Sequence, residues 1–470
     1  MISGEVLKYR NGFLIQKGYG VGLAGSSWFP LTLPPERFGA DWCLSPEQSL
    51  LVHAGNWRVP GQLLVRSPKA RNNVTNFPHG TSLLDVRSSM PTEIEVKKSL
   101  NLFPLPEALV ASSAGFFAQN ATDARVALAM VKDASDVLAL LLDGGHSTIA
   151  GRLAGAFRNI GRGRIADDIL KVMRAAGYEI READPFNAEA PLIVAARERS
   201  PYINRICLMW QEMCGIVEDQ FPEAPGTPKN IKQYLKRVED GYVTDAYHSL
   251  SIEGYRVSAE LIERVRGGAW NPDDDKNDRE HVNALAARGY HLAYQAVRGS
   301  VERVLGGESP GVVADEDHGT WYREMFAPSV TAGLLRPADL AGYRNGPVFI
   351  RRSMHVPPSR EAVRDLMPAF FDLLQEEESP SVRIVLGHFV FVYIHPYTDG
   401  NGRMGRFLMN VMLASAGYPW TVIPVKRRDD YMAALEEASV RQNIEPFTAF
   451  LAGLVTEGLE GRPAATTPSR

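Results

Sequence analysis

The spacing of apolar residues changes along the chain. Short apolar runs near the N-terminus, such as 12–15 (Gly-Phe-Leu-Ile) and 63–65 (Leu-Leu-Val), lie among Pro, Gly and aromatic residues, which predicts short strands joined by turns. Further on, apolar residues recur at helical spacing over residues 123–142 and again over 147–176. The first part of the chain therefore predicts strands followed by helices.

A proline-rich stretch divides the chain. Residues 218–230 hold three prolines and a glycine among charged residues, which is typical of a linker between domains. Beyond it the apolar pattern is mainly helical, and the polar C-terminal end predicts a disordered tail. We expect an α+β region over 1–215 (compatible with two small units, 1–115 and 116–215), a linker over 216–232, a mainly α domain over 233–458 and a tail over 459–470.

Composition and charge exclude several classes of protein. The chain of 470 residues has a net charge of −4 and a pI near 6.2, which argues against a protein that is basic overall and coats nucleic acid. Its three cysteines, Cys43, Cys207 and Cys214, form no disulfide framework and no C-x-x-C pair. The N-terminus lacks a signal-peptide pattern, and the most apolar run, residues 384–394, is too short to span a bilayer. We therefore expect a cytoplasmic protein that does not enter the membrane.

An apolar helix and a glycine-rich turn meet near residue 395. Residues 381–394 are apolar on nearly every face, as in a central buried helix, and His395-Pro396 ends that helix because proline cannot continue it. Residues 399–402, D-G-N-G, form a tight turn whose glycines allow unusual backbone angles, and helical spacing resumes at Arg403. A glycine-rich turn leading into a helix N-terminus presents free N–H groups and a positive dipole end. This segment therefore predicts an anion site.

Four side chains of the same segment suit phosphate chemistry. Arg403 and Arg406 lie three residues apart on one helix face and can fork onto phosphate oxygens. Asp399 can hold a cation that also bridges phosphates, and His395 can remove a proton from an attacking hydroxyl. A lone His-Pro pair is more typical of a helix-ending turn, but all these groups within twelve residues indicate a catalytic loop.

The whole segment resembles a known family signature. Residues 395–406 read H-P-Y-T-D-G-N-G-R-M-G-R, which is similar to the H-P-F-x-[DE]-G-N-G-R-x-x-R signature of the Fic (filamentation induced by cAMP) family. The one departure is Tyr397 in place of phenylalanine, an aromatic exchange that should keep the packing role. The resemblance implies a mainly helical Fic core over residues 240–458 and, as in typical members, transfer of AMP from ATP to a protein hydroxyl.

The resemblance also implies a role for each polar residue of the loop. His395 would be the general base toward a Ser, Thr or Tyr hydroxyl of the target, and Asp399 would bind Mg²⁺ (or Mn²⁺). ATP would be the co-substrate.

The remaining loop residues would hold the phosphates. Asn401, with the backbone N–H groups of Gly400 and Gly402, would bind the α-phosphate as charge develops on it. Arg403 would steady the outgoing pyrophosphate, and Arg406 would pair with the γ-phosphate.

Two flanking segments resemble further parts of the family. Residues 347–358 (P-V-F-I-R-R-S-M-H-V-P-P) resemble the flap, a β-hairpin that clamps the target peptide by strand pairing, and an ordinary connecting loop is the alternative. Residues 428–435 and 446–451 fit the family's closing helices. There Tyr431 either touches the adenine or ribose or packs in the core.

An inhibitory motif is the third resemblance. Residues 249–254, S-L-S-I-E-G, resemble the family's [ST]-x-x-x-E-[GN] motif, and Ser249 and Glu253 share a helix face because they lie four residues apart. In relatives the glutamate pairs with the second signature arginine, here Arg406. One arginine cannot serve a carboxylate and a phosphate at once, so Glu253, followed by Gly254, implies autoinhibition within the chain.

The leading hypothesis is therefore a protein adenylyltransferase held in check by Glu253. Removal of AMP, with Glu253 orienting a water, and use of another nucleotide donor stay open. A different class of function is an ATP-sensing regulator or nucleic-acid-binding protein, to which the basic residues of 152–174 could contribute, although an intact His395 argues against pure sensing. The target protein and the oligomeric state, a homodimer included, are not predicted.

Overall fold

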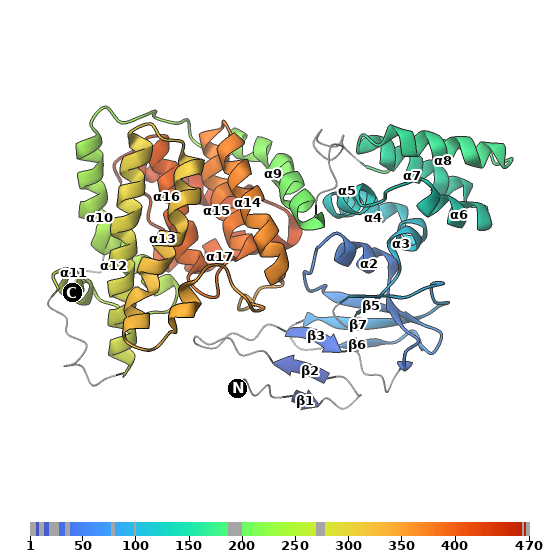
Figure 1. Ribbon diagram of the computed structural model, residues 1–470, viewed down its shortest axis with the longest axis horizontal. Helices are drawn as coiled ribbons and strands as arrows, with labels where there is room; N and C mark the ends of the chain where they lie inside the picture. Colours follow the sequence, from blue (N-terminus) through green and yellow to red (C-terminus); the bar gives the residue numbers. More distant parts are fainter. Residues whose placement is uncertain are drawn as a thin grey trace. The chain divides into compact units, whose positions relative to one another are not determined.

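The computed structural model describes residues 6–8, 14–17, 28–32, 38–76, 80–97, 100–186, 200–268, 278–462 and 465–466 (Figure 1). The chain divides into two compact units. The first consists of residues 1–212 together with 348–358, and the second of residues 213–347 and 359–470. The expected mainly α fold, preceded by a mixed α+β region, is confirmed.

Short strands form three sheets in the first unit. The apolar runs near residues 14 and 64 lie in strands, as expected. The first sheet is antiparallel, with the strand order β1 (Val6–Lys8), β2 (Leu14–Lys17), β3 (Trp28–Thr32). The second sheet is mixed because β5 and β7 are parallel, and its strand order is β4 (Cys43–Leu44), β5 (Gln62–Ser67), β7 (Ser82–Arg87), β6 (Val74–Asn76). The third sheet is the pair β8 (Glu95–Lys97) and β9 (Leu100–Leu102). The mixed sheet buries an apolar cluster that includes Phe38, Trp42, Trp57, Val65 and Leu83.

Helices of the first unit share a second apolar core. They are α2 (Pro46–His53), α3 (Leu105–Ala111), α4 (Ala114–Gln119), α5 (Ala121–Ala129), α6 (Ser135–Asp143), α7 (Ser147–Asn159) and α8 (Gly163–Ala175). Each long helical pattern in the sequence is two helices in the structure. A break at residues 130–134 separates α5 from α6, and Gly161 (φ 78°) separates α7 from α8.

Basic side chains on α7, considered for nucleic acid, have partners inside the first unit. Arg158 forms ion pairs with Asp167 (2.7 Å) and Glu182 (2.6 Å). Arg152 donates to the carbonyl oxygen of Ser112 (2.8 Å). These guanidinium groups are therefore engaged by the protein itself.

Residues 348–358, expected to form the flap, belong to the first unit. The Val59 N–H donates to the Met354 carbonyl oxygen (2.8 Å), and Val356 packs against the apolar cluster of the mixed sheet. A tight turn closes on the Ser353 N–H to Ile350 carbonyl bond (3.2 Å), with Arg352 at φ 61°. Within 347–358 no residue is in a strand, so the expected β-hairpin is not formed. Three prolines in the segment lack the N–H groups that a ladder needs.

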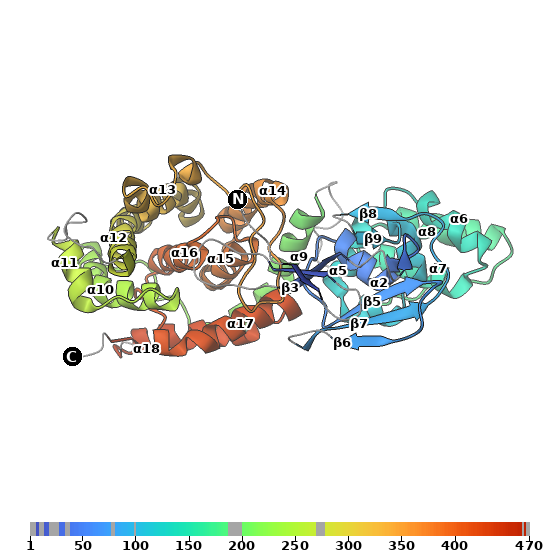
Figure 2. The same ribbon diagram turned by 90° about the horizontal axis from the view of Figure 1, so that it is seen from below.

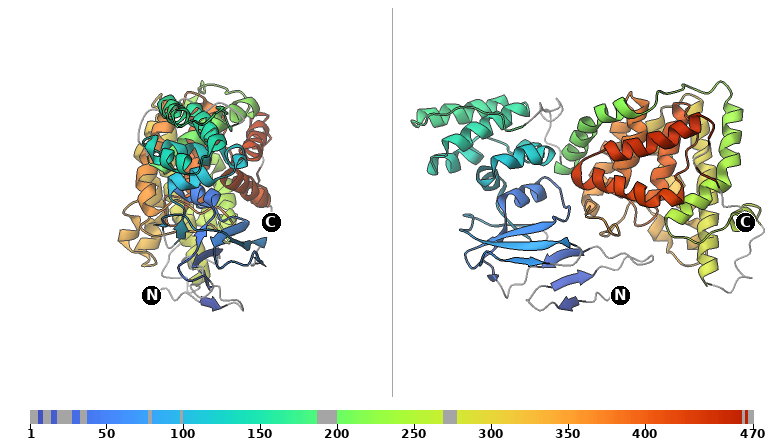
Figure 3. Two further views of the ribbon diagram at one scale, coloured as in Figure 1. Left: turned by 90° about the vertical axis from the view of Figure 1, so that its right-hand side faces the viewer. Right: turned by 180° about the vertical axis from the view of Figure 1, so that it is seen from behind.

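The second unit is an assembly of helices around α15 and α16. Figure 2 shows α13 and α14 on one side of this helical pair and α17 and α18 on the other, and Figure 3 (right) shows the face that α17 and α18 cover. The elements are α10 (Ile231–Ile252), α11 (Ala259–Arg266), α12 (Asp278–Leu305), α13 (Pro310–Thr331), η3 (Pro337–Leu340), α14 (Arg360–Glu376), α15 (Pro380–Ile394), α16 (Asn401–Ser415), η4 (Val425–Arg427), α17 (Arg428–Arg441) and α18 (Glu445–Leu459). As its sequence predicts, α15 is buried on nearly every face. None of the helices in the described ranges combines the length and the apolar character needed to cross a membrane.

The expected linker and tail make defined contacts in the second unit. α9 (Pro201–Gln220) runs past residue 215, and the chain after it lies against the end of α16, where the Gly226 N–H donates to the Ala416 carbonyl oxygen (3.0 Å). In the expected tail, the Thr466 carbonyl oxygen lies 3.2 Å from His248 Nε2. Residues 463–464 and 467–470 of that tail lie outside the described residues.

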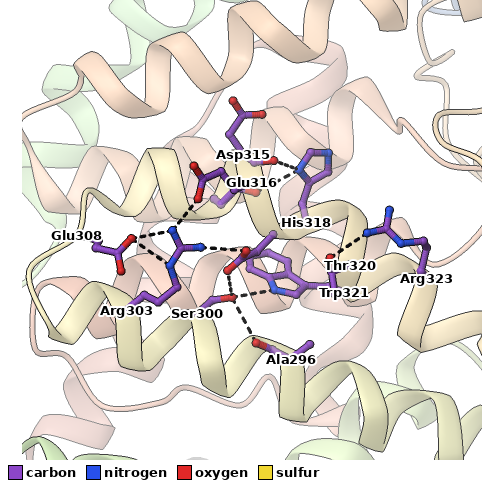
Figure 4. A network of polar contacts seen from close by, with 12 residues as sticks. Ala296, Ser300, Arg303, Glu308, Asp315, Glu316, His318, Thr320, Trp321 and Arg323 are labelled. Atoms are coloured by element: carbon purple, nitrogen blue, oxygen red, sulfur yellow. Dashed lines mark hydrogen bonds and ion pairs between the residues drawn. The ribbon is translucent and has the colours of Figure 1, made fainter.

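Figure 4 shows the polar network that joins α12 to α13. Trp321 Nε1 donates to Ser300 Oγ (3.0 Å), and Ser300 Oγ donates to Asp317 Oδ2 (2.6 Å). Arg303 adds a 3.0 Å ion pair with Asp317. Because Trp321 and Ser300 are buried while Arg303 is partly exposed, the hydrogen bonds fix α13 on α12 more firmly than the ion pair does. The position of α13 matters because its Tyr322 stacks on Tyr397 in the loop between α15 and α16.

We expect one buried ion pair to be critical for the stability of the first unit. Asp123 is buried, pairs with Arg205 and accepts two hydrogen bonds from Asn56 Nδ2 (3.2 and 3.1 Å). Asp123→Ala leaves a buried guanidinium without its carboxylate and should cost about 3–5 kcal/mol, measured by urea unfolding. The control is Asp167→Ala, which removes an exposed pair with Arg158 and should cost less than about 1 kcal/mol. Equal costs for the two variants would contradict this assignment.

Candidate active site

Two left-handed residues shape the loop between α15 and α16. His395 ends α15 with φ 53° and ψ 59°, and Gly400 precedes α16 with φ 81° and ψ 2°. A Cβ atom at Gly400 would lie 2.9 Å from Phe326 Cε2, so both the backbone and the space require glycine there. The loop therefore reverses the chain tightly and directs the N-terminus of α16 into the site.

Asn401 holds the loop together. Its Oδ1 accepts the Tyr397 N–H (2.9 Å), and its Nδ2 donates to the Tyr397 carbonyl oxygen (2.8 Å). Tyr397 is buried and stacks on Tyr322 of α13, with ring centroids 3.8 Å apart and an interplanar angle of 8°. The tyrosine thus keeps the packing role expected of the signature's phenylalanine. The Asn401 side chain, expected at the α-phosphate, is occupied by the loop backbone, which leaves its N–H group for an anion.

His395 is arranged to act as a base. Its Nδ1 lies 3.3 Å from the Val392 carbonyl oxygen, so the proton is assigned to Nδ1 and the lone pair to Nε2. Burial, opposed by the hydrogen bond to Val392 and assisted by the charge of Arg344, lowers the pKa of His395 to about 4. The imidazole is therefore neutral at pH 7 and able to accept a proton.

Arg403 lies in the first turn of α16, and Asp399 lies two residues before that helix begins. Arg403 is buried, and its guanidinium lies 5.1 Å from the Phe326 ring centre and 5.3 Å from that of Tyr255. Asp399 Oδ1 accepts the Gly400 N–H (2.7 Å), and Oδ2 lies 3.4 Å from Arg403 Nη2. Asp399 is 60% exposed, so its carboxylate is accessible to a cation. Among the described residues, no three His, Cys, Asp or Glu side chains gather in a way that could hold a metal without other ligands.

The expected inhibitory residues meet Arg406 directly. Arg406 Nη2 lies 2.7 Å from Glu253 Oε1, Arg406 Nε donates to Ser249 Oγ (2.9 Å), and Nη2 also donates to the Ser249 carbonyl oxygen (3.1 Å). Gly254 adopts φ 91°, which ends α10 immediately after Glu253 and which a residue with a side chain rarely adopts. The six-residue motif therefore places one carboxylate at the tip of α10, against α16.

The charge of Glu253 depends on that arginine. Burial raises the pKa of Glu253, but the charges of Arg406 and Arg403 outweigh it, so the pKa is lowered below its ordinary value. A Cβ at Gly402 would lie 2.5 Å from Glu253 Oε1 and 3.3 Å from Arg406 Nη1, so the glycine provides the space that the carboxylate occupies. Glu253 is therefore an ionised carboxylate directly at the anion site.

Some N–H groups of the two arginines are not used by the described residues. Arg406 Nη1 and Arg403 Nε are buried without a hydrogen-bond partner in the described part of the chain. The first-turn N–H groups of α16 likewise have no acceptor within the helix. Buried donors of this kind favour an anion with several oxygens, such as a polyphosphate.

Tyr431 is placed in the core. It is 1% exposed, and its hydroxyl lies 2.7 Å from His388 Nε2 on α15. Burial, opposed by the charge of Arg406, raises the pKa of Tyr431. Of the two interpretations offered for Tyr431, core packing behind Arg406 fits this position, because a side chain so buried presents no face to an adenine or ribose.

Three residues that touch the site were not predicted from the sequence. Asp245 and Tyr290 support the inhibitory helix: Tyr290 hydroxyl donates to Asp245 Oδ2 (2.6 Å), and burial raises the pKa of Asp245 to about 6. The available signal was that Asp245 precedes Ser249 by four residues and so shares its helix face. Arg344 donates from Nε to the His395 carbonyl oxygen (2.8 Å). It is 51 residues away from His395, and no local pattern marks it.

Comparisons with known proteins agree with the geometry. Residues 318–413 match the Fic/DOC family. Over 289 residues the chain is 28% identical to a protein adenylyltransferase Fic from Nematostella vectensis, covering 61% of this chain and 62% of that protein. Over 288 residues it is 30% identical to a protein of the same name from Drosophila mojavensis, covering 60% and 52%. A solved structure of Fic-1 (residues 134–508) from C. elegans aligns with a TM-score of 0.41 at 17% identity, covering 70% of this chain and 91% of that one.

The matched region spans about half the length of these curated relatives. The family match covers residues 318–413, which include α16 up to residue 413 and the loop in which His395, Asp399, Arg403 and Arg406 come together. This part of the chain is therefore similar to the Fic/DOC family.

Proposed function

We propose that the protein transfers AMP from ATP to a Ser, Thr or Tyr hydroxyl of a target protein. The observation that carries this proposal is a neutral His395 at the end of α15 beside two buried arginines in the first turns of α16. The match to the Fic/DOC family and the names of the relatives support the same reaction.

His395 would act on the target hydroxyl. The hydroxyl oxygen attacks the α-phosphorus of ATP while His395 Nε2 accepts the hydroxyl proton. A P–O bond forms between the target and AMP, the bond from the α-phosphorus to the bridging oxygen breaks, and pyrophosphate leaves with that electron pair. The neutral state of His395 supports this role, since a protonated imidazole could not accept the proton.

The first turn of α16 would hold the phosphates. The N–H groups of Asn401 and Gly402 suit the α-phosphate, where charge develops during the reaction, whereas the Gly400 N–H donates to Asp399 Oδ1 (2.7 Å). Arg403 would steady the departing pyrophosphate, and Arg406 would bind the γ-phosphate. The unused Nε of Arg403 and Nη1 of Arg406 support these two assignments.

Asp399 would hold a magnesium or manganese ion. The exposed carboxylate suits a cation that takes its other ligands from water and phosphate oxygens, as Mg²⁺ usually does. The ion would supply positive charge that offsets the charge of the triphosphate.

Glu253 would restrain this reaction. While Arg406 is bound by Glu253 and Ser249, two of its three nitrogens are unavailable to a γ-phosphate. The ionised state of Glu253 supports autoinhibition, because a carboxylate and a phosphate compete for the same guanidinium and repel each other. ATP would then bind without the contact that aligns its α-phosphate for attack.

The target protein would dock on residues 347–358. Phe349 is 40% exposed, and residues 347–350 belong to no helix or strand. An exposed aromatic residue on chain outside any sheet supports docking of a peptide there.

Loss of the Glu253 carboxylate should activate the enzyme. In Glu253→Gly, auto-AMPylation with labelled ATP should rise by about tenfold or more, because the γ-phosphate no longer competes with Glu253 for Arg406. GTP, UTP and CTP tested in parallel report the preferred donor. Glu239→Gln is the control, because Glu239 also lies on α10 but pairs with Arg266 and Arg298.

Adding His395→Ala to Glu253→Gly should abolish the label. Retained label in that double variant would contradict the base assignment, and no gain of label in Glu253→Gly would contradict autoinhibition.

The pH dependence should show a base with a low pKa. Because the pKa of His395 is lowered to about 4, the base stays neutral well below the ordinary histidine value. Auto-AMPylation by Glu253→Gly should therefore persist down to about pH 5 and fall only at more acidic pH, in kcat/KM for ATP, which reports the pKa of the free enzyme. The Glu253 charge raises the pKa of His395, so its removal in the variant should not move the loss of activity to a higher pH. A loss of rate centred near about pH 6.5, the ordinary histidine value, would contradict the assignment.

A further inference from the structure

The backbone of His395 adopts a conformation that its own residue type does not favour. A non-glycine residue in the left-handed region is strained and persists only where neighbouring groups hold it. His395 has φ 53° and ψ 59°, and this left-handed turn carries the chain out of α15 at the catalytic histidine. The surrounding contacts must therefore maintain the direction of the imidazole.

Arg344 supplies those contacts. Its Nε donates to the His395 carbonyl oxygen (2.8 Å), and its own backbone N–H donates to the Pro396 carbonyl oxygen (2.9 Å). Its Nη1 donates to the Gly346 carbonyl oxygen (3.1 Å), which fixes the guanidinium from the other side. The side chain is 3% exposed, so these bonds are shielded from water. The two carbonyl groups that follow α15 are thus both bound by one residue.

The position of Arg344 is itself fixed by the preceding residue. The Tyr343 hydroxyl lies 2.9 Å from His318 Nε2 on α13, and the two rings stack at 13°. His318 Nδ1 lies 2.7 Å from the Asp315 carbonyl oxygen, so Nδ1 carries the proton and Nε2 accepts from Tyr343. α13 is held in turn by the Trp321 and Ser300 contacts in Figure 4.

We infer that Arg344 is a positioning residue that sets the backbone of the catalytic histidine and links it, through Tyr343, to α13. The inference rests on the proposed function, in which His395 is the base. Arg344 donates to the main-chain oxygens of His395 and Pro396, so the role we assign to it is to orient His395.

A purely structural role makes a different prediction. If Arg344 merely holds the chain that leads into residues 347–358, its loss would lower stability without changing the rate of the folded enzyme at saturating ATP. The charged groups that act on this ring are Arg344, Asp399 and Glu253, and the positive charge of Arg344 opposes protonation of the imidazole. A positioning residue this close should therefore affect both the rate and the titration of His395.

The rate test uses the activated Glu253→Gly protein. Adding Arg344→Met should lower the auto-AMPylation rate at saturating ATP by about 100-fold with the KM for ATP changed less than about threefold, because a misplaced base slows chemistry more than binding. Arg383→Met is the matched control: Arg383 also donates to a carbonyl oxygen, that of Glu377 (2.7 Å), but at the other end of α15. The auto-AMPylation rate of Glu253→Gly should stay unchanged when Arg383→Met is added. Equal rates for the Arg344 and Arg383 variants would overturn the inference.

The titration test does not need activity. With ¹³C-labelled histidine and neither metal nor nucleotide present, the His395 signal is identified by its loss in His395→Ala. Arg344→Met should raise the pKa of His395 by about half a pH unit or more, while Arg344→Lys, which keeps the charge, should leave it nearly in place. An unchanged pKa of His395 in Arg344→Met would overturn the inference. An inactive Glu253→Gly protein would instead refute the proposed function, and the titration would still test the inference in that case.

Arg344→Lys also covers the case in which Arg344→Met does not fold. Lysine keeps a donor and a charge but cannot bond His395 and Gly346 together in one plane. A reduced rate with an unchanged KM for ATP in Arg344→Lys supports the inference, and a full rate overturns it.

Discussion

The contact between Arg406 and the tip of α10 is the interaction on which the rest of the account depends. A buried guanidinium needs hydrogen-bond acceptors, and here Ser249 and Glu253 provide them. In the proposed mechanism a phosphate would replace Glu253 at Arg406, so the arginine would keep an anionic partner in both states. Gly402 supplies the space that the Glu253 carboxylate occupies.

The catalytic loop works within a second constraint, which is the narrow turn between two buried helices. α15 is apolar on nearly every face and α16 is buried along most of its length, so the loop between them has little freedom to move. So short a reversal of the chain requires a left-handed residue at each end of the loop, and these residues are His395 and Gly400. Asn401 holds its interior and Arg344 holds its beginning. The reactive groups are thereby pre-oriented on rigid elements, as electrostatic catalysis requires.

The features that could be predicted from the sequence are those whose residues lie close together in the chain. The turn between α15 and α16 could be predicted because its glycines, arginines and helix start lie within one short segment, and the contact of Glu253 with Arg406 because a short motif marks it. The mainly α second unit and strands such as β5 were also predictable, since apolar periodicity is local. Arg344 and Tyr290 could not be, because their partners are remote in the chain. The hairpin expected at 347–358 did not form, because its prolines lack N–H donors and its backbone contacts Val59 instead.

The central claim is that Glu253 and the γ-phosphate compete for Arg406, and the ratio of ATP to ADP affinity tests it most directly. Calorimetric titration should give similar affinities for ATP and ADP in the unaltered protein, because Arg406 is occupied. The ratio of ATP affinity to ADP affinity should be about tenfold higher in Glu253→Gly than in the unaltered protein. Adding Arg406→Ala should remove that increase. An ATP to ADP ratio that is the same with and without Glu253 would contradict the account.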